Sequence, residues 1–545
     1  MTVGVAAPQT RSNQPAETRG ATCALVALIG LGVLLELLLI FAVAQPLSLL
    51  AYPWPLAVSE PIAALLGSGV VGIRGFLLVS TACSGLYVLS YIVGLQCRGH
   101  QALSIVIAFS VLFFITLLFT YPAGARDVFT NIIDGRMRWL DGFNPMVSPP
   151  RLASHDPLFW SMTYWQDEPS YYGPVWYLLL AVPARAVRSD LVANLFAFRS
   201  LTLPFLVGSA YLAARVAESF DRRRGVAAAV LVGWSPLLLW ESSVNGHNDV
   251  VLAFFALWAL YLALQKHWVA ALPLLALSIM TKYVTLILLP LFLIAAFRSQ
   301  GRRVAGPVVI GSILALALGV LVLAPFWEGP ATFSSLIQNG GNRFTSSPAA
   351  LLATFMDGNA ALPYYTSELA GERAKVITLI LFSLAYITIA LRLWCGSQDL
   401  LTSSFYSLFF FILLVSWWFW PWYVGWLVVI GGALVHQRAA RLSIVFSVAA
   451  LYGYAVLAWR TLLLGFETNV ALPAAMVVVV FLPAVAYWLA GLPKPAWLAE
   501  ALSEERSRSA GRKTAVRAGF APLPRLPYNR DHDGGYSASD IELHP

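Results

Sequence analysis

The sequence predicts an all-α fold, a polytopic transmembrane helical bundle, and three observations support that prediction. Of the 545 residues, 59% are apolar and 11% are charged, whereas soluble domains are about 45–50% apolar and about 25% charged. The apolar residues gather in runs long enough to cross a bilayer, which takes about 20 residues. Short basic segments separate these runs. This composition excludes a soluble enzyme, a nucleic-acid-binding module and a secreted scaffold built on disulfides.

We expect about 12–14 spanning helices, because apolar runs recur along most of the chain. The first run follows a polar N-terminal segment and has no convincing cleavage site after it, so it is interpreted as a retained anchor. Several later runs are short. The predicted spans are 22–44, 75–95, 102–120, 195–217, 226–241, 247–264, 268–281, 284–298, 304–324, 374–392, 402–416, 423–436, 442–459 and 470–491.

The basic residues predict that both termini lie in the cytoplasm. Cytoplasmic connections carry an excess of Lys and Arg, and an N-terminus placed inside puts every short basic connection inside as well. These connections hold Arg98, Arg222, Arg223, Arg224, Lys266, Arg298, Arg302, Arg303, Arg438 and Arg441. We therefore expect a multi-pass protein of the bacterial plasma (inner) membrane.

Three parts of the chain are expected. Residues 1–20 form a cytoplasmic tail, 21–494 the membrane domain, and 495–545 a cytoplasmic tail rich in Ser, Arg, Pro and Gly that is expected to be disordered. Two long segments of the membrane domain, about 121–194 and 325–373, fall on the outer side. Because connections carry binding and catalytic residues more often than the scaffold does, we expect chemistry on that side.

The first outer segment predicts an amphipathic helix over about 128–140, since apolar residues recur there at helical spacing and Gly142 and Pro145 follow as stop signals. We expect this helix to lie on the membrane surface. The run 172–187 looks like a span, but a full crossing there would place the basic segment 222–224 outside. It is therefore expected to be a re-entrant or surface-lying helix.

Five short motifs occur in order along the chain. They are Arg126-Asp127, Gly142-Phe143-Asn144-Pro145, Tyr172-Gly173-Pro174-Val175-Trp176, Asn245-Gly246-His247-Asn248-Asp249 and Thr281-Lys282-Tyr283. An acidic residue just outside an early span, followed by an amphipathic helix and these turns, resembles the GT-C superfamily of integral-membrane glycosyltransferases. Within it, the chain looks most like bacterial polyprenyl-phosphate-mannose-dependent mannosyltransferases, and the similarity extends over about residues 100–300.

This resemblance implies transfer of a sugar, mannose by similarity, from a polyprenyl-phosphate donor to a lipid or glycan acceptor on the extracytoplasmic face. It implies an inverting reaction in which Asp127 acts as the general base; the family often has two adjacent acids where this chain has Arg126 and Asp127. The residues expected to bind the donor phosphate or sugar are Arg126, His247, Asn248, Asp249, Lys282 and Arg343. Those expected to form an acceptor or lipid platform are Tyr172, Trp176, Trp420 and Trp422.

The acidic and amide candidates also have ordinary structural interpretations. Asp127 could cap the helix that follows it, and Asn248 with Asp249 could cap the next one. Asp134 lies four residues before Arg138, which favours a surface ion pair over catalysis.

The cationic and aromatic candidates have alternatives as well. Lys282 could extend its ammonium to the lipid headgroups. Arg343 could be solvated in its loop, although its planar fork suits phosphate oxygens. The aromatic run 417–423 could form part of an interfacial belt.

Two other functions stay open on the sequence alone. Glu36 lies within the first span, where a carboxylate is costly and often functional, so a transporter or flippase of lipid-linked glycans is the main alternative. A structural partner of a cell-envelope complex is the other. We expect no cofactor, no metal site and no nucleic-acid partner; the one Asp-x-Asp pattern, at Asp531 to Asp533, falls in the predicted C-terminal tail.

Overall fold

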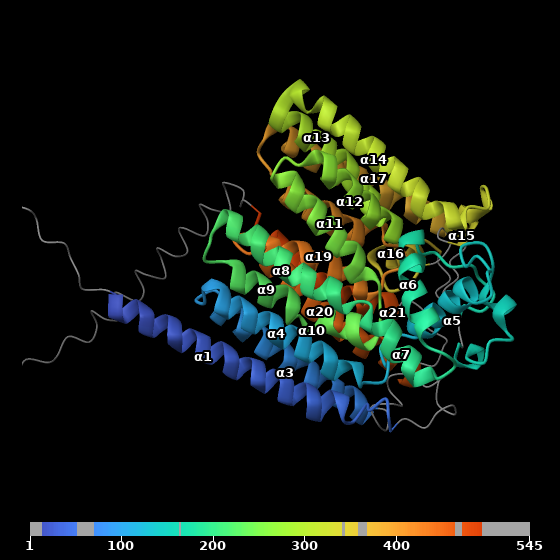
Figure 1. Ribbon diagram of the computed structural model, residues 1–545, viewed down its shortest axis with the longest axis horizontal. Helices are drawn as coiled ribbons and strands as arrows, with labels where there is room; N and C mark the ends of the chain where they lie inside the picture. The colour runs from blue at the N-terminus through green and yellow to red at the C-terminus, as the bar shows by residue number, and fades with distance from the viewer. Residues whose placement is uncertain are drawn as a thin grey trace, which may run out of the picture. The chain divides into compact units, whose positions relative to one another are not determined.

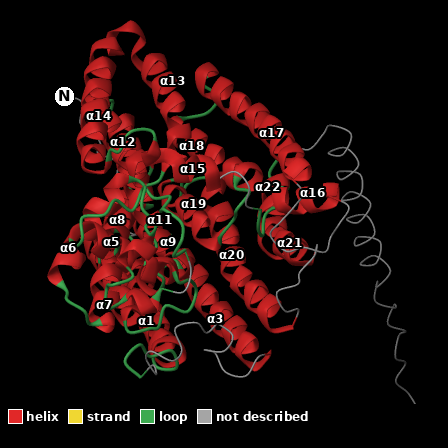
Figure 2. Ribbon diagram, turned by 90° about the vertical axis from the view of Figure 1, so that its right-hand side faces the viewer, coloured by secondary structure: helices red, strands yellow, loops and turns green. Residues whose placement is uncertain are grey.

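The computed structural model describes residues 14–51, 70–162, 165–339, 344–357, 368–463 and 471–492. The chain divides into two units, Met1–Ala490 and Gly491–Pro545. Of the second unit only Gly491 and Leu492 are described, so the predicted C-terminal tail lies outside the described residues. Within the described ranges the regular structure is entirely helical (Figure 2), which confirms the predicted fold class.

The N-terminal third begins with three long helices. α1 (Gln14–Leu39) continues through a π-helical turn at Ile40–Ala44 and packs against α3 (Val70–Gly94) and α4 (Gly99–Leu118), as Figure 1 shows. α1 begins inside the segment predicted as a tail. After α4 the chain leaves the bundle and forms a layer of short helices, α5 (Asp127–Trp139), α6 (Pro174–Ala186) and α7 (Leu191–Ser200).

The central third returns to the bundle. Its helices are α8 (Leu203–Phe220), α9 (Gly225–Gly233), α10 (Pro236–Leu239) with a π-helical turn at Trp240–Val244, α11 (Asp249–Leu264), α12 (Trp268–Thr281), α13 (Leu289–Gln300) and α14 (Ala305–Leu323). Prolines explain two interruptions: Pro204 lies in the first turn of α8, after the break from α7, and Pro236 opens α10 after a bend of 45° from α9. The predicted span at 226–241 is therefore bent, whereas the predicted span at 195–217 lies within one candidate membrane span, Leu191–Phe220.

The C-terminal third completes the bundle. Its helices are α15 (Ser334–Asn339), α16 (Pro348–Asp357), α17 (Glu368–Cys395), α18 (Leu400–Phe410) with a π-helical turn at Phe411–Val415, α19 (Val424–Ala433), α20 (Arg438–Leu463), α21 (Ala471–Met476) and α22 (Leu482–Leu489). α19 packs against α8, α9, α11 and α20, and every residue of α9 and α19 is buried. These two helices are apolar all round because protein surrounds them.

The helices support a multi-pass membrane protein. Among the described residues, eight are long and apolar enough to cross a membrane, or up to nine if the bent pair of α9 and α10 counts as one span. Four shorter apolar helices add to these, at Asp249–Leu264, Trp268–Thr281, Leu400–Val415 and Pro421–Ala433. All four coincide with predicted spans, so the short runs in the sequence correspond to short helices.

The layer of α5, α6 and α7 differs from the predicted surface helix. α5 is helical as expected, but most of its residues are buried, including Asn131, Asp134 and Arg136. The segment between α5 and α6 covers its polar face, where Arg136 forms a buried ion pair with Asp156 at 2.8 Å. α5 is thus a packed helix and not one lying free on a surface.

The predicted pair of Asp134 with Arg138 is also wrong. Arg138 donates to the carbonyl oxygens of Gly142 and Pro325 at 3.1 and 2.7 Å, and Asp134 is fully buried. Burial raises the pKa of Asp134 to about 7, against a smaller opposing effect of the Ser170 hydroxyl. A helix face that looks solvated in the sequence therefore lies in the core.

Candidate active site

Asp127 lies where the loop after α4 enters α5. It is the first residue of the helix; the capping position belongs to Arg126, whose side chain caps nothing. The helix dipole favours a carboxylate in this first turn. The Asp127 side chain is 24% exposed, so its carboxylate remains open to a substrate.

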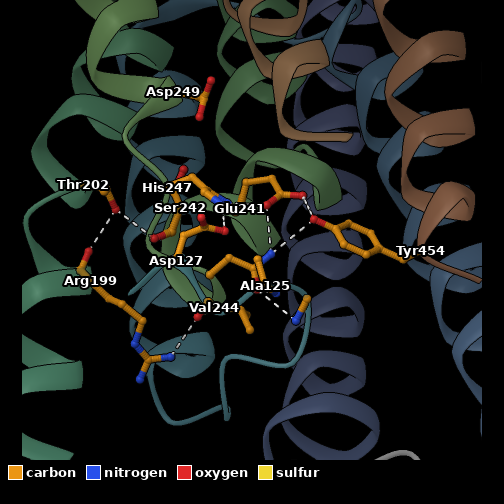
Figure 3. A network of polar contacts seen from close by, with 12 residues as sticks. Ala125, Asp127, Arg199, Thr202, Glu241, Ser242, Val244, His247, Asp249 and Tyr454 are labelled. Carbon is orange, nitrogen blue, oxygen red and sulfur yellow. Dashed lines mark hydrogen bonds and ion pairs between the residues drawn. The ribbon is translucent and has the colours of Figure 1, made fainter. Parts of the chain in front are cut away.

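His247 is buried between two carboxylates (Figure 3). Its Nδ1 lies 2.8 Å from Oε2 of Glu241, and its Nε2 lies 3.3 Å from Oδ2 of Asp127. Burial alone would lower the pKa of His247, but the hydrogen bonds and negative charges of Asp127 and Glu241 outweigh it and raise that pKa to about 9. At neutral pH both ring nitrogens of the imidazolium donate, one to each carboxylate.

Glu241 is the hub of the buried side of this network. The Tyr454 hydroxyl donates to its Oε1 at 2.5 Å, and the Asn245 amide donates to its Oε2 at 2.8 Å. Asn245 in turn accepts hydrogen bonds from the backbone N–H groups of Gly124 and Ala125 through its Oδ1. A side chain at Gly124 would clash with Asn245, so glycine allows this close approach. The network thereby fixes the loop that carries Asp127.

Arg199 braces the same loop from the opposite side. It is fully buried, and its guanidinium donates to the carbonyl oxygens of Thr120 at 2.7 Å, Val244 at 3.2 Å and Leu118 at 2.5 Å. These acceptors belong to the end of α4 and to the turn before Asn245. Figure 3 shows Arg199 below the turn that leads to His247. Arg199 thus holds the loop after α4 next to the turn before Asn245, and both segments carry residues of the site.

A second polar corner forms around Lys282. Its Nζ lies 3.0 Å from Oδ1 of the buried Asp249 and 3.2 Å from its Oδ2, while the Trp426 indole N–H donates to Oδ1 at 2.7 Å. The ammonium also lies over the rings of Tyr423 at 4.8 Å and Tyr172 at 5.6 Å. Asp249 is thus both the first residue of α11 and the partner of Lys282.

The Tyr172 segment is fixed at this corner by Gly173. Its N–H donates to the Thr281 carbonyl at 3.0 Å, and a Cβ at Gly173 would clash with the Met280 carbonyl. The motifs Tyr172–Trp176 and Thr281–Tyr283 therefore meet directly.

The aromatic run after α18, residues 417–423, reaches the ring of His247. Trp422 stacks on the His247 ring with centroids 4.0 Å apart, and Trp420 stacks on Trp422 at 5.0 Å. Trp422 is buried, whereas Trp420 keeps part of its surface exposed. Trp420 and Trp422 are therefore part of the candidate site and not just of an interfacial belt.

The other candidates are placed as follows. Trp176 is 1% exposed and donates to Asn131 of α5 at 3.0 Å, so it has no free surface for a substrate in this structure. Arg126 is half-buried beside Asp127. Asn248 is buried next to His247, and neither of its amide atoms has a hydrogen-bond partner among the described residues. Arg343 lies outside the described residues.

Glu36, on which the transporter alternative rests, belongs to α1. It is buried between α1 and α4, where it accepts a hydrogen bond from the Thr116 hydroxyl at 2.5 Å. Among the described residues, no group of three or more His, Cys, Asp or Glu side chains is arranged to hold a metal ion.

The structure thus brings together Asp127, His247, Asp249, Lys282, Tyr172 and Trp422 at neighbouring helix ends. It adds Glu241, Tyr454, Asn245 and Arg199, which sequence reasoning did not assign to the site. A signal existed for Glu241, a carboxylate at the end of an apolar run beside the Asn245 motif. Tyr454 gave none.

A family model described as alpha-(1->6)-mannopyranosyltransferase, N-terminal domain, matches residues 19–298. That stretch contains Asp127, Glu241, His247, Asp249 and Lys282. The chain belongs to this mannopyranosyltransferase family.

One relative in this mannopyranosyltransferase group is alpha-(1->6)-mannopyranosyltransferase A of Corynebacterium glutamicum, which is 24% identical over 259 residues. The match covers 43% of this chain and 51% of the relative, so the chain spans about half of that protein's length. The family match ends before α14. Trp422, Trp426 and Tyr454 lie beyond it, and the second half of the chain therefore completes the candidate site.

Proposed function

We propose that this protein transfers a mannosyl group from a polyprenyl-phosphate donor to a lipid or glycan acceptor on the extracytoplasmic face of a bacterial plasma membrane. The observation that carries the proposal is that two groups of polar residues, one around Asp127 and His247 and one around Lys282, lie together within the stretch that the family model matches. One presents an accessible carboxylate held by a buried imidazolium, and the other presents an ammonium set among aromatic rings. A transferase of this class needs a base for the acceptor and a cation for the departing phosphate.

Asp127 is the proposed general base. Its carboxylate is the most exposed acidic group of the network, and the imidazolium of His247 holds it in place without covering it. A carboxylate that stays ionised and oriented can accept the hydroxyl proton as the acceptor attacks. His247 is thus proposed as a positioning residue, which refines its predicted role in donor binding.

Lys282 is the proposed partner of the donor phosphate. Its ammonium has three N–H groups and its side chain is 17% exposed, whereas its partner Asp249 is buried. The rings of Tyr172, Tyr423 and Trp426 surround it, which lowers the local dielectric and strengthens its attraction for an anion. Asn248, whose amide atoms have no hydrogen-bond partner within the described ranges, is the proposed ligand for sugar or phosphate oxygens beside Lys282.

The proposed reaction is a single displacement with inversion. The acceptor hydroxyl oxygen forms a bond to the anomeric carbon, and its proton passes to Asp127. The bond between that carbon and the phosphate oxygen breaks, and its electron pair leaves with the polyprenyl phosphate. We take over the linkage from the family description, so the attacking group would be a 6-hydroxyl of a mannose.

The sidedness follows from the alternation of helix directions. With the N-terminus in the cytoplasm, the end of α4, the start of α11 and the end of α12 all lie on the outer side. The basic connections at 98, 222–224 and 266 then lie inside. A donor whose phosphate sits at headgroup depth would meet Lys282 there.

The proposal is tested by a transfer assay on the purified full-length protein in lipid. Labelled polyprenyl-phosphate-mannose is supplied with a mannoside acceptor, to wild type and to Asp127→Asn in parallel. Transfer by wild type alone supports both the activity and the base. Absence of transfer by wild type, with the glucose and arabinose donors also inert, would reject the proposed class.

A further inference from the structure

An apolar cavity of about 220 Å³ lies between α1, α3 and α10, and the proposed chemistry makes no use of it. α1 and its π-helical turn contribute Leu39 and Val43, and α3 contributes Gly75 and Ser80. π-helical turns widen a helix locally and often occur at functional positions. We call this space the α1/α3 cavity.

The lining of the α1/α3 cavity selects for hydrocarbon. Nearly all of its side chains are aliphatic or aromatic, and the helices that form two of its walls are candidate membrane spans. A sugar would have to give up its hydrogen bonds to enter such a space, whereas an alkyl chain would gain by burial, about 0.8 kcal/mol for each methylene. The shape and chemistry therefore suit the chain of a lipid.

One end of the α1/α3 cavity adjoins the network of Glu241, His247 and Asp127. Trp240 lines the cavity, and the next residue is Glu241 of the His247 network. The Trp240 indole N–H is buried without a hydrogen-bond partner in the part of the chain that the structure describes, and it lies against Gly124, three positions before Asp127. A donor group at that point suits the polar junction between a lipid chain and its sugar.

The cavity and the Lys282 corner use different helices. Lys282, Asp249 and Trp426 belong to the ends of α12, α11 and α19, none of which lines the cavity. If the donor phosphate binds at Lys282, the cavity is left for the second substrate. We propose that the α1/α3 cavity binds the alkyl chain of a lipid-anchored acceptor and so delivers its sugar to Asp127. This inference rests on the proposed function.

The test uses two glycines of α3 as a matched pair. A Cβ added at Gly75 or at Gly85 meets open space, but only Gly75 lines the cavity. Wild type, Gly75→Leu, the control Gly85→Leu and a second filling variant, Ser80→Leu, are assayed in lipid nanodiscs. The acceptors are octyl α-mannoside and methyl α-mannoside, which share the sugar and differ in the chain.

We expect the two filling variants to raise the KM for octyl mannoside by about tenfold or more, the effect of losing burial of roughly two methylenes. Methyl mannoside kinetics and the donor KM should stay unchanged, which also shows that the variants fold. Gly85→Leu should match wild type. A raised donor KM would instead assign the cavity to the donor chain and overturn the proposal, as would unchanged octyl mannoside kinetics.

A second readout separates this inference from the proposed function. Octyl mannoside with a photoreactive diazirine at the end of its chain is crosslinked to each protein without any donor. Crosslinking lost in both filling variants and kept in Gly85→Leu supports the cavity even if no mannose is transferred. Equal crosslinking in all four proteins rejects it, whatever the activity.

Discussion

Tyr454 donates a hydrogen bond of 2.5 Å to Oε1 of Glu241, across 213 positions of sequence. Glu241 is hydrogen-bonded to His247, and His247 is hydrogen-bonded to Asp127. Tyr454, on α20, therefore helps to orient the carboxylate of Asp127 at the start of α5. Each link is buried except the last, whose carboxylate faces the open side of the site. The arrangement combines a rigid support with an accessible reactive group, and it yields testable expectations.

Asp127→Asn should lower kcat by about 10²–10⁴-fold, the usual contribution of a general base, with the protein still produced and folded. Asparagine keeps the shape and can still hydrogen-bond to His247, but it cannot accept the hydroxyl proton. The measurement is transfer of labelled mannose together with thermal unfolding of the purified protein. Asp167→Asn, which changes an exposed carboxylate of the same outer segment, is the control. Equal losses of activity and stability would favour a structural role.

Protonation of His247 should set the alkaline limit of activity. Its folded-state pKa of about 9 lies above the ordinary value of 6.5, so the interaction is fully present below about pH 6.5 and is lost as the pH rises through about 9. We expect both transfer and unfolding temperature to fall over that window. Glu241→Gln removes one of the two anions and should shift the alkaline limb of kcat/KM to lower pH. An unshifted profile would show that Glu241 does not act through His247.

Lys282→Met should raise the KM for the donor by about 10–100-fold, which corresponds to the 1.5–3 kcal/mol typical of a hydrogen bond to a charged group. Lys282→Arg should recover part of the loss because it keeps the charge. Lys375 provides a matched control: it lies over the rings of Phe344 and Trp417 and pairs with Glu372, but it lies on α17 outside the candidate site. Were Lys375→Met to raise the donor KM as much, the effect could not be assigned to phosphate binding.

The sequence predicted the parts of the site that lie in short connections. Asp127, His247, Asp249 and Lys282 were singled out because they lie in the motifs that carry the family resemblance, and all four lie at neighbouring helix ends. What the sequence could not show is the partner of each. His247 meets Asp127 across 120 positions and Trp426 meets Asp249 across 177, and helix packing alone decides such contacts.

The fold class followed from composition, whereas local helix geometry did not. The bend at Pro236 divides a run that looked continuous, since an apolar run shows no difference between a straight and a bent helix. The polar residues of α5 were expected to face water because their spacing is that of an amphipathic helix. The covering segment that pairs Asp156 with Arg136 has, among its described residues, only two short 3-10 helices, Pro150–Ala153 and Phe159–Ser161, which are too short to leave a periodic signal in the sequence.

The buried carboxyl of Asp134 should make the stability of the protein depend on pH. Its carboxyl ionises at about pH 4 in the unfolded chain, but burial raises the folded-state pKa to about 7. The folded protein therefore loses stability as the pH rises from about 4 to about 7 and the buried group is forced to ionise. Asp134→Asn cannot ionise, and we expect it to unfold at a temperature higher than wild type by on the order of a few degrees at pH 8.

The same change should have little effect at pH 4, where the wild-type carboxyl is neutral in the folded state. Thermal unfolding of both proteins at pH 4, 6 and 8 measures the difference, with Asp167→Asn as the control because the Asp167 carboxylate is largely exposed. A gap between Asp134→Asn and wild type that does not grow with pH would mean that Asp134 stays ionised in the fold. Its burial inside α5 would then need a cationic partner that the described contacts do not supply.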